Sequence, residues 1–249
     1  MAVREGQLIA ITSVKGGVGK TTFLLNLAVA FKDKRVLIVD FDLSGSAIAA
    51  SLNKEFKYDL FDLFDDVEHK RFNQLGEYVV KYNDQIDFIA APKDPRKSLK
   101  LNINLLNLVF YQFKVKYDII LIDTNHNIDK TNLLIMDLVN QIIFLTTPNL
   151  IDLKNLRTML NIYKNMEKTN YKIVLNRAKD KHKDDYDDTE VRALLNHNID
   201  YVLGKDCFQN NFEKDLLMGK IGYSRLKNKK VYQQMVKALE VGVQNEKIS

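Results

Sequence analysis

Six short runs of apolar residues recur along the chain, and each is apolar at consecutive positions rather than at alternating ones. Consecutive apolar positions are typical of parallel strands that are covered on both faces, because neither face of such a strand meets water. The runs predict strands over residues 8–13, 36–42, 86–91, 118–123, 141–147 and 171–176.

Helical patterns of apolar residues fill the intervals between these strands. The predicted helices cover residues 21–32, 69–82, 100–116, 131–138, 152–167, 188–197 and 231–242. Strand–helix–strand alternation predicts an α/β fold, with a mostly parallel, twisted sheet, right-handed crossovers and helices on both faces. No linker rich in proline, serine or glycine interrupts the pattern, so we expect a single domain over residues 1–249.

The composition narrows the class of protein. Apolar residues make up 46% and charged residues 28% of the 249 residues, which favours a folded domain over a disordered chain. Cys207 is the only cysteine, so an intrachain disulfide and a four-cysteine metal site within one chain are excluded. We expect a cytoplasmic protein, because the longest apolar helical stretch, residues 23–31, is too short to span a bilayer and no signal peptide is recognisable.

The segment after the first predicted strand carries the clearest chemistry. It reads VKGGVGKTT over residues 14–22 and leads into an apolar helical stretch. Glycines let the backbone form a nest of N–H donors at a helix N-terminus, where the helix dipole favours phosphate. We expect Lys20 near the β- and γ-phosphates of ATP, Thr21 on Mg²⁺ and Thr22 on phosphate. The alternative is a glycine-rich turn that holds no ligand.

Two predicted strands end on an aspartate. Asp123 follows four apolar residues in DIILID, which is the Walker B pattern of a carboxylate that holds Mg²⁺ through its water shell. Asp40 ends the second strand in VLIVDFD, and the alternative for Asp40 and Asp42 is to cap the helix that follows. His126, three residues after Asp123, is interpreted as a loop histidine rather than as a general base.

The string KGGVGKTT departs from the ordinary phosphate loop in a specific way. Val14 stands where that pattern has glycine, and a second lysine, Lys15, precedes the glycines. This string resembles the deviant Walker A box of the ParA/MinD family of P-loop ATPases. The segment TTPNLIDLKNLRTML at residues 146–160 and the string VLNR are similar in particular to the Tad-type pilus-localisation branch of that family.

The resemblance implies an ATPase that forms a homodimer when it binds ATP and Mg²⁺. In such a dimer Lys15 would reach the phosphates of the partner, Asp40 would position the attacking water, and Asn176 would bind the adenine edge. The alternative for Asn176 is a turn at the end of a strand. The expected nucleotide-binding residues are Gly16, Gly17, Val18, Gly19, Lys20, Thr21, Thr22 and Asn176.

Two segments of this chain differ from the usual family pattern. Asp42 is followed by Leu43-Ser44-Gly45, where the family often has Pro-Gln-Gly. Asp123 is followed by Thr124-Asn125-His126 instead of prolines or glycines. These differences leave the hydrolysis rate open.

The charge distribution suggests what the switch acts on. The net charge is +5, and the segment 220–230 contains five cations and no acidic residue. These cations are Lys220, Arg225, Lys227, Lys229 and Lys230. The first hypothesis is a DNA-partitioning ATPase that binds DNA non-specifically and is stimulated by a partner protein. A solvated basic surface is the alternative to a DNA-binding patch.

The second hypothesis is a membrane- or pole-associated ATPase that positions division sites, flagella or pili. A membrane-bound form would need an amphipathic C-terminal helix with large apolar residues against a basic face. The helical pattern at 231–243 is weak in such residues, which favours a packed terminal helix. The two hypotheses place the protein on the nucleoid or at a cell pole.

Overall fold

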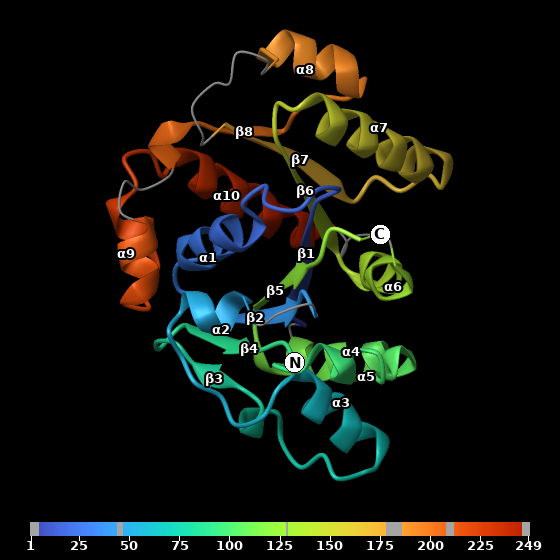
Figure 1. Cartoon of the computed structure of the whole chain (residues 1–249), viewed down its shortest axis with the longest axis vertical. Coiled ribbons are helices and arrows are strands. Elements are labelled where there is room, and N and C mark those ends of the chain that lie inside the picture. Colours follow the sequence, from blue (N-terminus) through green and yellow to red (C-terminus); the bar gives the residue numbers. More distant parts are fainter. Residues whose placement is uncertain (1–4, 44–46, 128, 178–185, 208–211, 246–249) are drawn as a thin grey trace.

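A sheet of eight strands forms the centre of the computed structural model (Figure 1). The structure describes residues 5–43, 47–127, 129–177, 186–207 and 212–245. The strands are β1 (Gln7–Thr12), β2 (Val36–Phe41), β3 (Val80–Lys81), β4 (Ile86–Ile89), β5 (Ile119–Thr124), β6 (Gln141–Thr146), β7 (Tyr171–Asn176) and β8 (Tyr201–Leu203). Their order is β3-β4-β2-β5-β1-β6-β7-β8, and every neighbouring pair is parallel except β3 and β4.

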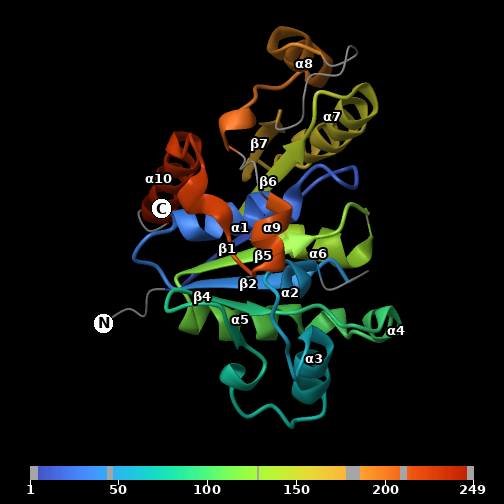
Figure 2. The same cartoon turned by 60° about the vertical axis from the view of Figure 1, so that its left-hand side comes forward.

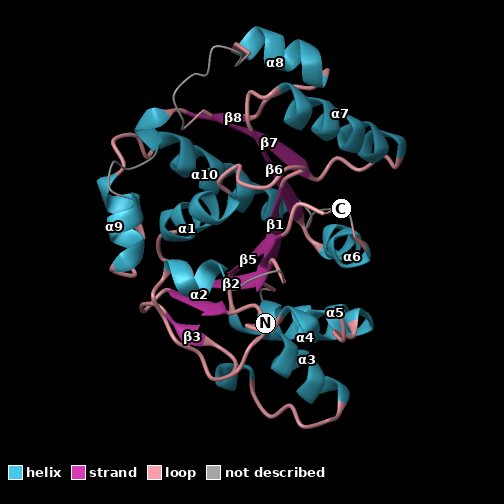
Figure 3. Ribbon diagram, in the orientation of Figure 1, coloured by secondary structure: helices cyan, strands magenta, loops and turns pink. Residues whose placement is uncertain are grey.

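Helices cover both faces of this sheet (Figure 3). They are α1 (Lys20–Ala30), α2 (Ala47–Ser51), α3 (Leu60–Glu68), α4 (Pro95–Ser98), α5 (Leu106–Lys116), α6 (Lys130–Leu138), α7 (Leu150–Asn165), α8 (Asp188–Leu195), α9 (Phe212–Leu217) and α10 (Lys230–Asn245). Short 3₁₀ helices occur at Leu75–Glu77, Ile103–Leu105, Lys205–Cys207 and Gly222–Arg225. Among the helices of the described part of the chain, none has both the length and the apolar composition that a membrane span requires.

The two faces of β1 show why the central strands are apolar at every position. Leu8 and Ala10 pack into the core on the side of α5, α6 and α7, whereas Ile9 and Ile11 pack into the core on the side of α1 and α10. All six residues of β1 are buried. The prediction of parallel strands covered on both faces, and with it the α/β fold class, is confirmed.

The predicted helix at 69–82 is wrong. Residues 69–74 form no helix, and the segment instead continues into a 3₁₀ turn at Leu75–Glu77 and the antiparallel edge strand β3. The helix lies just before this segment, as α3, where Asp59 caps the first turn by accepting from the Asp62 N–H. Tyr78 is buried, and its hydroxyl donates to Asp66 on α3, so tertiary contacts hold the segment in its irregular path.

Helix α9 lies beside α2, and the residues that follow each of these helices are in contact (Figures 1 and 2). Gly219 has a φ of +63°, and a Cβ added to it would lie 2.3 Å from the carbonyl oxygen of Leu52. Only glycine allows both this backbone conformation and this contact. The Asn53 side-chain amide also donates to the Leu217 carbonyl over 3.4 Å. The segment just before the predicted basic patch is therefore anchored on the turn that follows α2.

Candidate nucleotide site

The loop between β1 and α1 has the backbone shape of a phosphate cradle. Gly17 and Gly19 have φ values of +74° and +95°, which side chains other than glycine rarely adopt. A Cβ on Gly19 would also lie 2.9 Å from the Asn176 side-chain nitrogen. Helix α1 starts at Lys20, directly after this loop, so its first-turn N–H groups point into the loop as an anion site.

The two lysines of the loop differ in their surroundings. Lys20 is 8% exposed, and its Nζ donates to the Ser13 hydroxyl over 3.1 Å. That hydroxyl donates in turn to the Lys15 carbonyl over 2.8 Å, so Ser13 connects the lysine to the start of the loop. The Lys15 side chain is exposed, as a residue that reaches a second chain must be. Ser13 was not predicted as a site residue, and its position just before the loop was its only signal in the sequence.

Asp123 ends β5 beside the first turn of α1. The Thr21 hydroxyl donates to its Oδ2 over 2.8 Å, and the carboxylate is 1% exposed. Burial raises the pKa of Asp123 to about 6, although the hydrogen bond from Thr21 and the charge of Lys20 act in the opposite direction. Its Oδ1 is buried and accepts no hydrogen bond from the described residues. A hydroxyl and a carboxylate with a vacant oxygen form a donor set that suits Mg²⁺.

Asp40 lies opposite Asp123 in the register of β2 and β5. It is fully buried, and burial together with the charge of Asp123 raises the pKa of its carboxyl well above the usual value. Its two oxygens accept from the N–H groups of Asp42 and Ile48, each over 3.2 Å. Ile48 belongs to the first turn of α2, so Asp40 makes the capping contact that was the alternative to a role in hydrolysis. That role stays a prediction.

Asn176 ends β7 next to the phosphate loop. Its side-chain nitrogen donates to the Val18 carbonyl over 2.8 Å, and the residue is 8% exposed. The contact supports the loop from the side of β7. Its expected role in binding adenine stays a prediction.

The loop after Asp123 is fixed by a network of amides that the sequence did not reveal. The Asn125 Oδ1 accepts from the Asn127 N–H over 2.8 Å and from the Asn132 side chain over 2.6 Å. Asn132 lies on α6 and is 1% exposed. Its backbone N–H donates to Asp129, which caps that helix. The network holds the turn over residues 125–127.

The five cations of the predicted DNA patch are not equivalent. Arg225 donates over 2.5 Å to Asp215, which is 1% exposed. The charge of Arg225 is therefore partly compensated by an aspartate that lies outside the segment 220–230. Lys229 donates to the Ser224 carbonyl and lies 5.6 Å from the centre of the Tyr223 ring. Lys220, Lys227 and Lys230 are exposed.

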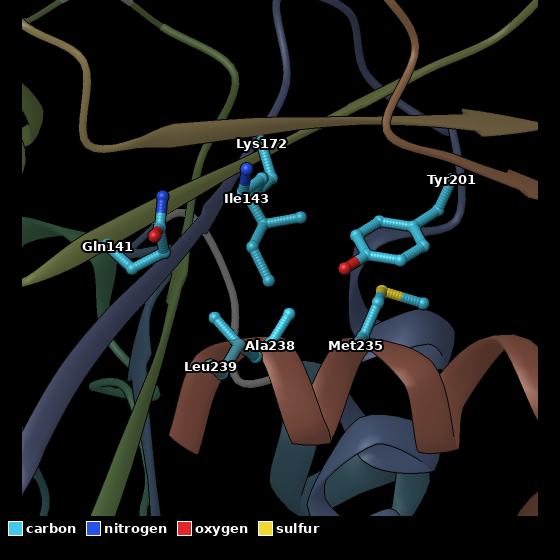
Figure 4. Close-up of a pocket in the computed structure, with 7 residues that line it drawn as sticks. All are labelled: Gln141, Ile143, Lys172, Tyr201, Met235, Ala238 and Leu239. Carbon is cyan, nitrogen blue, oxygen red and sulfur yellow. The ribbon is translucent and has the colours of Figure 1, made fainter. Parts of the chain in front are cut away.

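A small cavity lies between α10 and the sheet (Figure 4). Gln141, Lys172 and Tyr201 line it from the amino-terminal parts of β6, β7 and β8. The phosphate loop follows the carboxyl end of β1, at the opposite edge of the parallel sheet. This cavity is therefore separate from the candidate nucleotide site.

Known proteins share both the sequence pattern and the fold. Residues 9–214 match the family described as the CobQ/CobB/MinD/ParA nucleotide binding domain. The chain belongs to this family. The septum site-determining protein MinD of Bacillus subtilis is 30% identical to this ParA/MinD chain over 148 residues, which cover 58% of this chain and 54% of MinD. The chain thus spans about half the length of this curated relative.

Solved structures of ParA/MinD ATPases have the same fold. A ParA family ATPase from Chlorobium tepidum superimposes with a TM-score of 0.75 at 21% identity, covering 92% of this chain and 98% of that protein. MinD of Pyrococcus horikoshii, in complex with Mg-ADP, has a TM-score of 0.75 at 21% identity and covers 94% and 96% of the two chains. The family resemblance predicted from KGGVGKTT is confirmed.

Proposed function

We propose that this chain binds ATP and Mg²⁺ at the phosphate loop and hydrolyses ATP slowly, as a switch that dimerises on ATP. The observation that carries this proposal is the arrangement around the first turn of α1. A buried lysine, Lys20, and a hydroxyl–carboxylate pair, Thr21 with Asp123, lie beside a glycine loop whose backbone is shaped for anions. These are the parts that phosphoryl transfer requires, since such catalysis is mostly positioning and charge neutralisation.

Each residue has a distinct task in this proposal. Lys20 and the loop N–H groups bind the phosphates, and Thr21 and Asp123 hold Mg²⁺, directly or through its water shell. When bound, Mg²⁺ neutralises charge on the phosphates during transfer. Lys15 extends to the nucleotide of a second copy, which links ATP binding to dimerisation. Asp40 orients the water and, through its contact with Ile48, connects the site to α2.

The proposed output is ATP-dependent, non-specific DNA binding for plasmid or chromosome partitioning, with hydrolysis stimulated by a partner protein. Lys220, Lys227 and Lys230 support it, since they are exposed cations that DNA phosphates attract. This function would place the protein in the cytoplasm, on the nucleoid. The alternative is a positioning ATPase at a membrane or cell pole, which the 30% identity to a septum site-determining protein favours.

Assays of dimerisation, nucleotide binding, DNA retention and vesicle binding test the proposal. Light scattering after size exclusion should show a monomer with Mg–ADP and a dimer with Mg–ATP, and Lys20→Ala should abolish nucleotide binding. Retention on duplex DNA should require ATP and fall steeply with salt. DNA retention that is equal with and without ATP would contradict partitioning. If the ATP dimer instead floats with anionic vesicles and ignores DNA, the positioning function is correct.

A further inference from the structure

His126 lies over the phosphate loop although it belongs to a different part of the chain. A Cβ added to Gly16 would lie 3.4 Å from Cε1, 3.6 Å from Nδ1 and 3.7 Å from Nε2 of the His126 ring. These three atoms form the nitrogen-bearing edge of the imidazole. The polar edge of His126, and not its carbon edge, therefore faces Gly16, the first glycine of the phosphate loop.

The backbone on either side of His126 is held in place. Asn125 accepts hydrogen bonds from Asn127 and from the buried side chain of Asn132, so residues 125–127 form a fixed turn. His126 is exposed at the tip of this turn. Within the described residues, no hydrogen bond or ion pair engages its ring. The backbone that carries this imidazole is thus held in place, while its two nitrogens are engaged by no hydrogen bond or ion pair from the described residues.

The position of His126 in the chain indicates which end of a nucleotide it would meet. It follows Asp123 by three residues, and Asp123 is the proposed Mg²⁺ carboxylate. In phosphoryl-transfer sites Mg²⁺ bridges the β- and γ-phosphates. A ring at the rim of the loop on this side is near the terminal phosphates and away from the base. An imidazole N–H is a good donor to phosphate oxygen, and the donor is stronger when the ring is protonated.

We propose that His126 is a phosphate-binding residue that senses the γ-phosphate, with an imidazole N–H donating to a terminal phosphate oxygen. This inference rests on the proposed function, because it requires a nucleoside triphosphate in the loop. The proposed contact to phosphate comes from residues 124–126, one of the two segments in which this chain differs from the usual family pattern. His126 then distinguishes ATP from ADP within one subunit.

The test compares nucleotide affinities in the full-length chain. Dissociation constants for a non-hydrolysable ATP analogue and for ADP, both with Mg²⁺, would be measured for wild type, His126→Ala, His126→Gln and His69→Ala. Loss of one charge-assisted hydrogen bond predicts an analogue affinity about tenfold weaker in His126→Ala, with ADP affinity nearly unchanged. Glutamine keeps an N–H donor and should restore part of the loss. His69, an exposed histidine at the end of α3, is the control and should have no effect.

A spectroscopic measurement tests the contact directly. The chain has four histidines, so their ring resonances can be assigned by substitution. The His126 resonances should shift with the ATP analogue much more than with ADP, while those of His69 and His197 stay in place. An unchanged ratio of the two affinities in His126→Ala, or a ring signal that ignores the analogue, would refute this role alone. A wild-type chain that binds neither nucleotide would refute the proposed function as well.

Discussion

Replacing Asp123 with asparagine should make the nucleotide-free protein more stable while it disables the site. The folded-state pKa of Asp123 is raised from 3.8 to about 6. The folded chain therefore binds a proton on the Asp123 carboxyl more tightly than the unfolded chain does. Stability is lost as the pH rises and this proton dissociates. Above pH 6 this penalty amounts to roughly 3 kcal/mol in the free energy of unfolding. Asparagine never ionises, so the variant escapes the penalty.

The substitution also has a cost. An asparagine oxygen can still accept from Thr21, but its NH₂ group would then replace the buried Oδ1, which accepts no hydrogen bond from the described residues, and would need an acceptor instead. An unpaired buried donor costs about 1–2 kcal/mol. The net expected gain at pH 7.5 is therefore about 1–2 kcal/mol. Between pH 7.5 and pH 5 this advantage should shrink by roughly 1 kcal/mol, because wild-type Asp123 becomes protonated.

Urea denaturation at the two pH values, with and without Mg–ADP, measures all of these quantities. A ligand at about 100 times its dissociation constant stabilises the wild type by about 2.7 kcal/mol, whereas the variant should gain little, so the order of stability reverses. Asp84→Asn is the control, because the side chain of Asp84 is 97% exposed and its loss should change little. A variant that is less stable than wild type at pH 7.5, or a difference that does not depend on pH, would refute the reasoning.

Three further predictions concern the dimer, α2 and the basic segment. Lys15→Ala should abolish the ATP-dependent dimer in light scattering, while Asp40→Ala should keep the dimer and slow phosphate release by about 100-fold or more. Gly219→Ala should lower the free energy of unfolding by roughly 1–3 kcal/mol in urea titrations, because its φ of +63° is strained for alanine and the methyl meets a carbonyl oxygen. Lys227→Gln should lower the salt dependence of DNA binding by about one counterion and leave the stability unchanged. Arg225→Gln should also lower the free energy of unfolding by about 1–3 kcal/mol, because it removes the guanidinium that donates to buried Asp215.

The sequence predicted the features that depend on local pattern. The six strands were visible because buried parallel strands are apolar throughout, and the phosphate loop was visible because its glycines and lysines are contiguous. Features that depend on tertiary contacts were missed. The helix predicted at 69–82 is replaced by an irregular segment held by Tyr78 on Asp66, and the charge on Arg225 is compensated by an aspartate ten residues away. In the sequence Asn132 is an ordinary polar residue of a predicted helix, and only the fold places its side chain against Asn125.

The pair of carboxylates at the centre of the sheet is costly for a chain that only has to fold. Asp40 and Asp123 are opposite each other on neighbouring strands, both are buried, and burial raises the pKa of each. Two such buried groups lower stability where they are charged, and apolar residues would pack in their place without this penalty. The arrangement is sensible only if an ion or nucleotide relieves the penalty when it binds. Asp40 also accepts from the Ile48 N–H in the first turn of α2. A change in the charge of this pair of carboxylates therefore changes the strength of that contact. In the proposed switch, a nucleotide that changes the charge at this pair would therefore act on the contact between Asp40 and α2.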